Sequence, residues 1–269
     1  MELLLLGTGA SDGIPAFFND SRVSRHAREH GGKDVRTRSC ALLNGDIQID
    51  FPPDLFCQYR REGLDPQDWS ALVFTHSHED HFCVSELQYA LFPFTDRESL
   101  PYVIYANAEI ERKIEARYPE WPIEIVQTHS FESYQLGKVK LTPIAAHHKE
   151  DEDSQNLIFE QDGKTILYAT DTGIWREPTW EFLQGWSFDL LILECTDGKV
   201  PQAYHGHLSI ETAVSVVDRL RNMNALHSSS TIVTTHHSHL GEATHAELER
   251  LLEPHAIHPG FDGMRLTLG

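Results

Sequence analysis

The chain has 269 residues, of which 40% are hydrophobic, so it can bury a sizeable core in one large domain or two small ones. Its 22 basic residues are outnumbered by 41 acidic ones, and the net charge of -19 at pH 7 disfavours a long polyanion such as nucleic acid as a partner. Apolar runs all fall short of the roughly 18 to 20 residues of a membrane span, which argues against a transmembrane protein.

The amino terminus and the cysteines favour a cytoplasmic location. The apolar run after Met1 is only four leucines long and lacks a basic start, so we expect a buried strand and not a signal peptide. The four cysteines are scattered without a CxxC pair, which argues against a disulfide framework and against a thiolate zinc site. They are Cys40, Cys57, Cys83 and Cys195.

Short β-rich runs and helical patterns are interspersed along the whole chain, without a repeat, a low-complexity tract or a linker. Strands are expected at Glu2–Leu6, Ala41–Asn44, Ile47–Phe51, Ala71–Thr75, Tyr102–Tyr105, Lys138–Ala145, Asn156–Glu160, Thr165–Thr170, Leu190–Glu194, Thr231–Thr235 and Gly263–Leu268. Helices are expected at Asp54–Arg61, Val84–Phe92, Ala108–Tyr118, Pro178–Gln184, Ser209–Arg221 and Thr244–Leu252.

This pattern predicts a single α+β domain over residues 1–269. The last two helices are the best marked, because Ser209 caps one and Thr244 with Glu247 forms a capping box at the other. Strands outnumber helices, and the helices are spread along the chain. The layered architecture expected for such a chain is a four-layer αββα sandwich, with two mixed sheets packed together and helices on both outer faces. The polar segment Phe17–Arg38 is assigned no fixed structure.

A cluster of ionisable residues directly follows the expected strand Ala71–Thr75. Within six positions it contains His76, His78, Asp80 and His81. Burying so many ionisable groups in one turn is costly unless a metal ion compensates them. Residues two apart in an extended turn point the same way, so His76 and His78 can bind one ion while Asp80 and His81 reach a second.

Further ligands are expected at the ends of other strands, where active-site groups commonly lie. His147 and His148 follow one strand, Asp171 follows a second, and His236 follows a third. Each residue alone is a weak signal, since Asp171 could belong to a turn and either histidine of the pair could face solvent. Their recurrence at the same structural position indicates two metal sites.

With these motifs the chain resembles the metallo-β-lactamase superfamily, over nearly its whole length. The opening Leu6–Ala10 and the closing Gly260–Met264 resemble the cyclic-phosphate phosphodiesterases of the carbon–phosphorus lyase pathway, and some features are shared with the tRNA 3′-processing enzymes. The resemblance implies two divalent metal ions, bridged by Asp171. It assigns His76, His78 and His148 to one ion, and Asp80, His81 and His236 to the other. We also count Asp80 as catalytic.

His207 matches the position at which this phosphodiesterase branch keeps a catalytic histidine that binds no metal. It also precedes the helix expected at Ser209–Arg221, whose free amides favour an anion, so a protonated imidazole there could donate to a leaving oxygen. His207 could instead only decorate the loop. His205 is an adjacent competitor, and His205 and His239 are candidates for binding substrate, with a surface role open for His239.

One departure concerns the cysteine cluster that this family usually carries after its opening glycine loop. Residues Phe17–Ser39 contain no cysteine, so we expect no structural zinc site. His26 and His30 would face the same way on a helix, but two histidines make a poor site by themselves. The departure weakens the link to the family's particular substrate.

We therefore expect a dinuclear phosphodiesterase acting on a small, cyclic phosphodiester, with zinc or manganese as its two ions. The ions would lower the pKa of a bridging water, and the hydroxide would attack phosphorus while His207 protonates the leaving oxygen. Alternative functions are a tRNA 3′-processing endoribonuclease, a lactonase, a thioesterase or a non-catalytic accessory protein of cofactor biosynthesis. Nucleic acid and membranes are not expected as partners, and a homodimer is left open.

Overall fold

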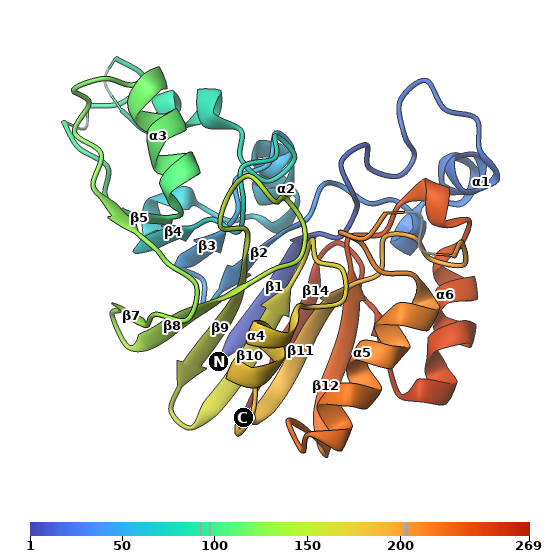
Figure 1. Ribbon diagram of the computed structural model, residues 1–269. Helices are drawn as coiled ribbons and strands as arrows, with labels where there is room; N and C mark the ends of the chain where they lie inside the picture. The colour runs from blue at the N-terminus through green and yellow to red at the C-terminus, as the bar shows by residue number, and fades with distance from the viewer. Residues whose placement is uncertain (92, 97, 202–203) are drawn as a thin grey trace.

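Two seven-stranded mixed sheets lie face to face in the computed structural model, which describes residues 1–91, 93–96, 98–201 and 204–269 (Figure 1). The first sheet has the order β14 (Met264–Thr267), β1 (Glu2–Gly7), β2 (Cys40–Leu43), β3 (Ile47–Ile49), β4 (Ala71–Val73), β5 (Val103–Ala106) and β6 (Ile125–Gln127). The second has the order β13 (His258–Pro259), β12 (Leu226–Thr235), β11 (Phe188–Glu194), β10 (Lys164–Ala169), β9 (Gln155–Gln161), β8 (Val139–Ala145) and β7 (Tyr134–Leu136).

Helices cover both outer faces, which confirms the expected αββα sandwich. The outer face of the first sheet is covered by α2 (Leu55–Glu62), the 3-10 helix η3 (Val84–Ala90) and α3 (Ala108–Arg117). The second sheet is covered by α4 (Glu177–Phe182), α5 (Ile210–Asn222) and α6 (His245–Leu252). Among the described residues, no helix is both long enough and apolar enough to cross a bilayer.

Strand β1 shows why four consecutive leucines form a strand here. Side chains alternate between the two faces of a strand, and both faces of β1 are buried. Leu3 and Leu5 join the core between the sheets, whereas Leu4 and Leu6 join the core beneath α2. Each fully buried leucine contributes roughly 1.5 to 3 kcal/mol relative to an exposed one, so burial on both faces strongly favours this placement.

Both predicted capping motifs are present. Ser209 caps α5 by accepting a hydrogen bond from the Thr212 amide, and Thr244 caps α6 in a reciprocal box with Glu247. Such caps satisfy amides that lack partners within the helix and are each worth about 1 kcal/mol.

The segment Phe17–Arg38, to which no structure was assigned, contains the helix α1 (Arg22–His30). Ser21 caps it, and only Val23, Ser24 and Ala27 are buried, so its apolar stripe is too narrow to be recognised in the sequence. His26 and His30 do share a face of this helix, with their ring centroids 4.1 Å apart.

Other differences concern short elements. The helix expected at Val84–Phe92 is a 3-10 helix that ends at Ala90, and Phe92 lies outside the described residues. Three short strands were not predicted, namely β6, β7 and β13. Each has only two or three residues, which is too short for alternation to be detected.

Candidate metal centre

The topology brings the carboxyl ends of several strands to one edge of the sandwich. Strands β10, β11 and β12 are parallel, and β8 runs in the same direction as β10 because both are antiparallel to β9. His148, Asp171 and His236 follow the ends of β8, β10 and β12, Glu194 is the last residue of β11, and β4 of the other sheet leads into His76. Residues far apart in the sequence therefore meet at this edge.

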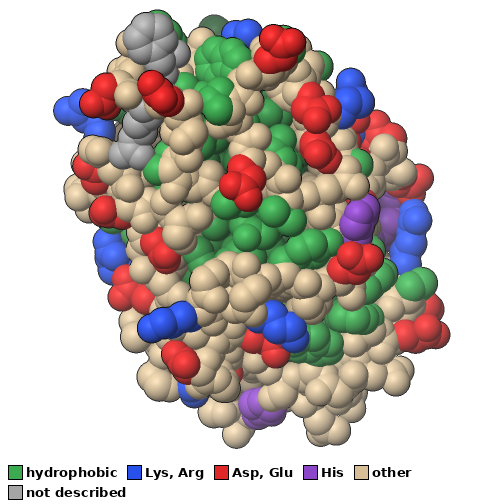
Figure 2. All heavy atoms as spheres, turned by 90° about the vertical axis from the view of Figure 1, so that its left-hand side faces the viewer, with side chains coloured by type: hydrophobic (Ala, Val, Ile, Leu, Met, Phe, Trp, Pro, Cys, Tyr) green, Lys and Arg blue, Asp and Glu red, His purple; other side chains and the backbone are tan. Residues whose placement is uncertain are grey.

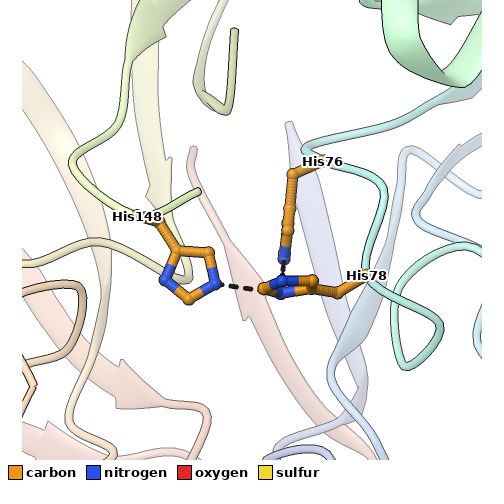
Figure 3. A group of neighbouring side chains, drawn as sticks. All are labelled: His76, His78 and His148. Carbon is orange, nitrogen blue, oxygen red and sulfur yellow. Dashed lines mark hydrogen bonds between the residues drawn. The ribbon is translucent and has the colours of Figure 1, made fainter. Parts of the chain in front are cut away.

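Three histidines form the first cluster. The Nδ1 atom of His78 lies 2.9 Å from Nε2 of His76 and 3.0 Å from Nε2 of His148. Figure 3 shows His76 and His148 converging on His78 from two different loops. The Oδ1 atom of Asp171 lies 3.5 Å from Nε2 of His148 and completes a set of four donor atoms. By contrast, Nδ1 of His147 lies 2.9 Å from the carbonyl oxygen of Ile174.

The second cluster gathers on the other oxygen of Asp171. Its Oδ2 atom lies 2.9 Å from Nε2 of His81 and 3.2 Å from Nε2 of His236. The Oδ2 atom of Asp80 lies 3.5 and 3.6 Å from the same two nitrogens. The structure thus brings together all seven residues that the sequence nominated as ligands, in two groups that share Asp171.

The spacing of these donor atoms fits metal ions. Four ligand atoms at about 2.0 to 2.1 Å from a tetrahedral ion lie roughly 3.3 Å from one another. The distances between neighbouring ligand atoms in the two clusters range from 2.9 to 3.6 Å and so bracket this value. Nitrogen and carboxylate donors without thiolate suit zinc or manganese.

Protonation in the first cluster is also compatible with ligation, which requires neutral imidazoles. Burial lowers the pKa of His76 well below its usual range, and burial likewise lowers the pKa of His78 and of His148. In the second cluster, burial alone would lower the pKa of His81, but the carboxylates of Asp171 and Asp80 raise it well above its usual range. An ion bound there would displace this proton.

Hydrogen bonds on the far side of three histidines orient their rings. His81 Nδ1 lies 2.7 Å from the buried Asp50 carboxylate, and His148 Nδ1 lies 2.9 Å from the carbonyl oxygen of Gly206. His236 Nδ1 lies 2.8 Å from the hydroxyl oxygen of Thr196. Each acceptor favours the proton on Nδ1, which leaves the Nε2 lone pair directed into the site.

Backbone strain accompanies this arrangement. Asp171 and His236 have φ values of 48° and 55°, and Asp50, which contacts His81, has a φ of 61°. Residues with side chains rarely adopt this left-handed region, and each instance costs of order 1 to 3 kcal/mol. Such strain persists where the surrounding structure holds it, and here three instances lie at one site.

A buried carboxylate links His207 to the second cluster. Glu194 Oε1 lies 2.8 Å from His207 Nδ1, and the Thr196 hydroxyl, which contacts His236, donates to Glu194 Oε2 at 2.6 Å. Burial by itself would lower the pKa of His207, but the Glu194 carboxylate raises it to about 9. The imidazole ring of His207 lies 4.9 Å from that of His148 and 5.6 Å from that of His236. A protonated group therefore borders both clusters.

Gly173 allows the His207 loop to approach the Asp171 loop. A Cβ atom at Gly173 would lie 1.7 Å from the carbonyl oxygen of His205, which no side chain can tolerate. The two strand-end loops therefore touch through their backbones, and this contact holds His207 beside the cluster.

The two candidates for substrate contact lie in different surroundings. The His205 side chain is half exposed, and its Nε2 atom lies 3.6 Å from Glu150. His239 is buried, and its Nε2 atom lies 2.6 Å from the carboxylate of Asp12. His239 thus connects the loop after β12 with the loop after β1.

Sequence reasoning missed the carboxylates that support the site. Asp50 and Glu194 are both fully buried at strand ends, as Asp171 is. The expected strands Ile47–Phe51 and Leu190–Glu194 include these two residues, so the rule that selected ionisable residues beyond a strand passed over both. Glu152 was missed as well, although it accepts hydrogen bonds from the amide and the hydroxyl of Ser77, between His76 and His78. It lies in an acidic run, and a sequence offers no signal to separate it from its exposed neighbours.

Comparisons with known proteins agree with this geometry. The family model described as "Beta-lactamase superfamily domain" matches residues 47–237. This is more than half of the chain, so the chain belongs to the beta-lactamase superfamily, and it is a metal-dependent hydrolase that binds divalent metal.

The relatives differ in function and length. A curated protein of Porphyromonas gingivalis named octanoyltransferase is 26% identical, and its match covers the whole of this chain but 52% of the relative. The chain thus spans about half the length of that relative.

Solved structures of this fold cover the whole chain. A structure described as a new diphosphatase from the PhnP family is 26% identical with a TM-score of 0.79, covering 100% of this chain and 98% of that one. Zinc-bound PqqB from Methylobacterium extorquens is 17% identical with a TM-score of 0.76, and both chains are fully covered. The human short-form tRNase Z is 18% identical with a TM-score of 0.62, again with both chains fully covered. At these lower identities, the last two likenesses concern the fold alone.

Proposed function

We propose that the chain hydrolyses a small phosphodiester, for example a cyclic one, with two divalent ions, zinc or manganese. His76, His78 and His148 would hold one ion, while Asp80, His81 and His236 would hold the other, and Asp171 would contribute one oxygen to each. When bound, such a pair of ions supplies an activated water and neutralises the charge of the attacked phosphate. Asp80 would hold one of these ions and would in this way take part in catalysis.

The observation that carries the proposal is the Glu194–His207 pair at the edge of both clusters. Alkoxides are poor leaving groups, and a phosphodiester with an alkyl leaving group needs a proton donor at the leaving oxygen. Burial lowers the pKa of His207, but the Glu194 carboxylate raises it by more, to about 9. Glu194 thereby favours the protonated form of His207 at neutral pH. His207 thus has the charge state and the position of a general acid.

Other residues contribute to binding and shape. We propose that the half-exposed His205 contacts substrate directly, since solvent and substrate can reach it. His239 is buried against Asp12, so we infer that it acts on substrate through the loop that carries Asp12. The likeness to a diphosphatase supports a substrate with a phosphate ester or anhydride bond.

The net charge of -19 favours a small substrate over structured RNA. The octanoyltransferase relative adds one specific competitor, an octanoyl thioester, because a hydrolase of this fold can also accept acyl substrates.

A comparison of substrates tests the proposal. The protein loaded with manganese or zinc is given bis(p-nitrophenyl) phosphate, a five-membered cyclic ribose phosphate, a dinucleoside diphosphate, a phosphomonoester, a lactone, an octanoyl thioester and pre-tRNA. We expect turnover of the diesters and weak activity on the monoester. The His76→Ala variant controls for contaminating enzymes. Preference for the thioester or the lactone, or specific cleavage of pre-tRNA at physiological salt, would refute the proposed substrate class.

A further inference from the structure

A further group of metal-binding side chains lies at the surface, beside the first cluster. A ring nitrogen of His147, a ring nitrogen of His205 and a carboxylate oxygen of Glu150 lie within 4.8 Å of one another. The Nε2 atom of His205 is 3.6 Å from Oε1 of Glu150, and the rings of the two histidines have centroids 5.0 Å apart. These three residues are distinct from the seven ligands of the two metal clusters.

The backbone holds the two histidines of this group together. The loops after β8 and β11 both pack on the turn 172–174, which follows β10. The His147 amide donates to the Thr172 hydroxyl oxygen at 3.0 Å, and the Gly173 amide donates to the His147 carbonyl oxygen at 2.9 Å. Because Gly173 has no side chain, the carbonyl group of His205 can approach the same turn. The positions of both loops are thus fixed before any ligand binds, which lowers the entropic cost of binding.

The three side chains suit a zinc ion. The Ile174 carbonyl oxygen accepts a hydrogen bond from Nδ1 of His147 at 2.9 Å, so Nε2 keeps the lone pair that a metal binds. Two imidazoles and one carboxylate are a ligand set of zinc sites that keep a fourth position for water. A tetrahedral ion requires ligand atoms roughly 3.3 Å apart, so the group must close by up to roughly 1.5 Å. The side chains of His205 and Glu150 are 53% and 60% exposed and can turn without disturbing the core.

The charges around this group also favour a cation. Arg176 pairs with Glu150 at 2.5 Å, but its side chain is 62% exposed, and such a surface pair contributes little to stability, so an ion can displace the arginine. Acidic side chains are spread over the face of the molecule shown in Figure 2, and the net charge is -19. The field of such a protein raises the concentration of cations near its surface.

We propose that His147, Glu150 and His205 form a third metal site, which takes a zinc ion with water as its fourth ligand. The site is exposed and has three protein ligands, so it fills only when zinc exceeds what the two buried clusters require. Imidazole ligands favour zinc over manganese, so manganese should not fill it. The bound ion joins the loop that carries His148 to the loop that carries His207.

This arrangement makes the third ion an inhibitor, a consequence that rests on the proposed function. His205 is proposed there to contact substrate, and an ion bound to its imidazole would remove that contact. Excess zinc should therefore raise the KM for a phosphodiester and leave kcat nearly unchanged.

The first experiment counts bound zinc and does not depend on activity. The metal-loaded protein is dialysed to equilibrium against buffers of increasing zinc concentration and then subjected to elemental analysis. We expect one zinc ion more per wild-type chain than per chain of His147→Ala or Glu150→Gln, whatever the occupancy of the two clusters. The matched controls are His26→Ala, which removes a histidine 3.4 Å from Asp34, and Asp151→Asn, which alters an acid whose side chain is 76% exposed. Both controls should keep the extra ion, and manganese in place of zinc should give no extra ion.

A second experiment tests the competition at Glu150. Arg176→Ala removes the side chain that the ion must displace, so it should lower the dissociation constant of the extra zinc ion by about two- to five-fold. The matched control is Arg25→Ala, which removes the same charge from a surface pair with Asp20 on and before α1. An equal change in both variants would mean that total charge, and not the pairing with Glu150, sets the affinity.

The third experiment measures inhibition on bis(p-nitrophenyl) phosphate. Rising zinc should increase the KM of the wild-type protein, whereas Glu150→Gln should resist this effect and keep the basal activity. A protein that binds the extra ion but does not hydrolyse the diester would contradict the proposed function and still support the third site. Equal zinc contents in the wild type, His147→Ala and Glu150→Gln would overturn the third site, as would an extra ion that is lost in His26→Ala instead.

Discussion

The carboxylate of Glu194 lies 2.8 Å from Nδ1 of His207, and through the hydroxyl of Thr196 it also reaches the back of His236. One buried group thus supports a candidate acid and a candidate metal ligand. Glu194 further accepts hydrogen bonds from the amides of Thr172 and Leu208, which fixes it between the loops after β10 and β11. Substitutions can separate proton donation from metal binding, because the first affects the dependence of the rate on pH and leaving group and the second affects the metal content.

The loss of rate on replacing His207, the candidate acid, should depend on the leaving group of the substrate. We expect His207→Ala to keep its metal content and to slow hydrolysis of a diester with an alkyl leaving group by roughly 10² to 10⁴. Nitrophenolate leaves without a proton, so the loss on an aryl diester should be much smaller. Turnover of both diesters and elemental analysis check this. Equal losses would indicate phosphate binding, and loss of metal would make His207 a ligand.

Glu194→Gln should change the pH profile. Glu194 raises the pKa of His207 against the effect of burial, to about 9, so the acid form predominates below that pH and is lost as the pH rises through it. Without the carboxylate, the alkaline loss of activity on an alkyl diester should begin at lower pH. Rates measured from pH 6 to 10 check this, with the aryl diester as the control. An unchanged alkaline limb would show that another group titrates.

Much of the fold and of the site could be predicted because both follow from side-chain patterns. The leucines of β1 predicted a buried strand, and the capping residues Ser209 and Thr244 predicted the starts of two helices, all of which the structure contains. His76 and Asp171 were found because ionisable residues at strand ends are conspicuous against the apolar strands before them. The narrow apolar stripe of α1 and the short strand β6 gave no such contrast.

Asp50 and Glu194 mark the limit of that reasoning. Each ends a strand just as Asp171 does, but Asp50 contacts a histidine from behind, whereas Asp171 faces two clusters of nitrogens. Whether a carboxylate touches the front or the back of an imidazole depends on the direction of its side chain in the folded protein, which the sequence does not encode locally.

The shared position of Asp171 predicts unequal effects on metal content. Its two oxygens face different clusters, so Asp171→Ala should reduce the occupancy of both sites, whereas His78→Ala should affect chiefly the site shared with His76 and His148. Elemental analysis after metal-supplemented expression should give two ions per wild-type chain. A wild-type content that never exceeds one ion would contradict the dinuclear arrangement.

Asp262 should be important for stability. Its carboxylate accepts hydrogen bonds from the amide and hydroxyl of Thr8 and of Thr37, and it pairs with Arg61 at 3.0 Å. Asp262→Ala removes the acceptor and leaves these donors unsatisfied, so we expect a loss of about 3 kcal/mol in the free energy of unfolding. Urea denaturation checks this. The control is Asp20→Ala on the surface, whose side chain is 79% exposed and should change stability by less than about 1 kcal/mol.

The last prediction concerns Glu152, which supports the loop of the first cluster. Its buried carboxylate accepts hydrogen bonds from the Ser77 amide at 3.1 Å and the Ser77 hydroxyl at 2.9 Å, and it receives a third from the Asn107 amide group at 3.1 Å. Because Ser77 lies between His76 and His78, these bonds hold the loop segment that carries both imidazoles.

We therefore expect Glu152→Ala to weaken metal binding at the first cluster by about 10- to 100-fold, the usual effect of losing a group that orients ligands, while the second cluster is less affected. A chelator competition that resolves the two affinities measures this. The matched control is Asp151→Ala, the adjacent acid, whose side chain is 76% exposed and pairs with Lys149. Equal weakening in both variants would mean that the negative charge near the site matters, and not the contacts of Glu152. Glu152→Gln keeps an acceptor oxygen without the charge, so it should retain most of the affinity if orientation is the cause.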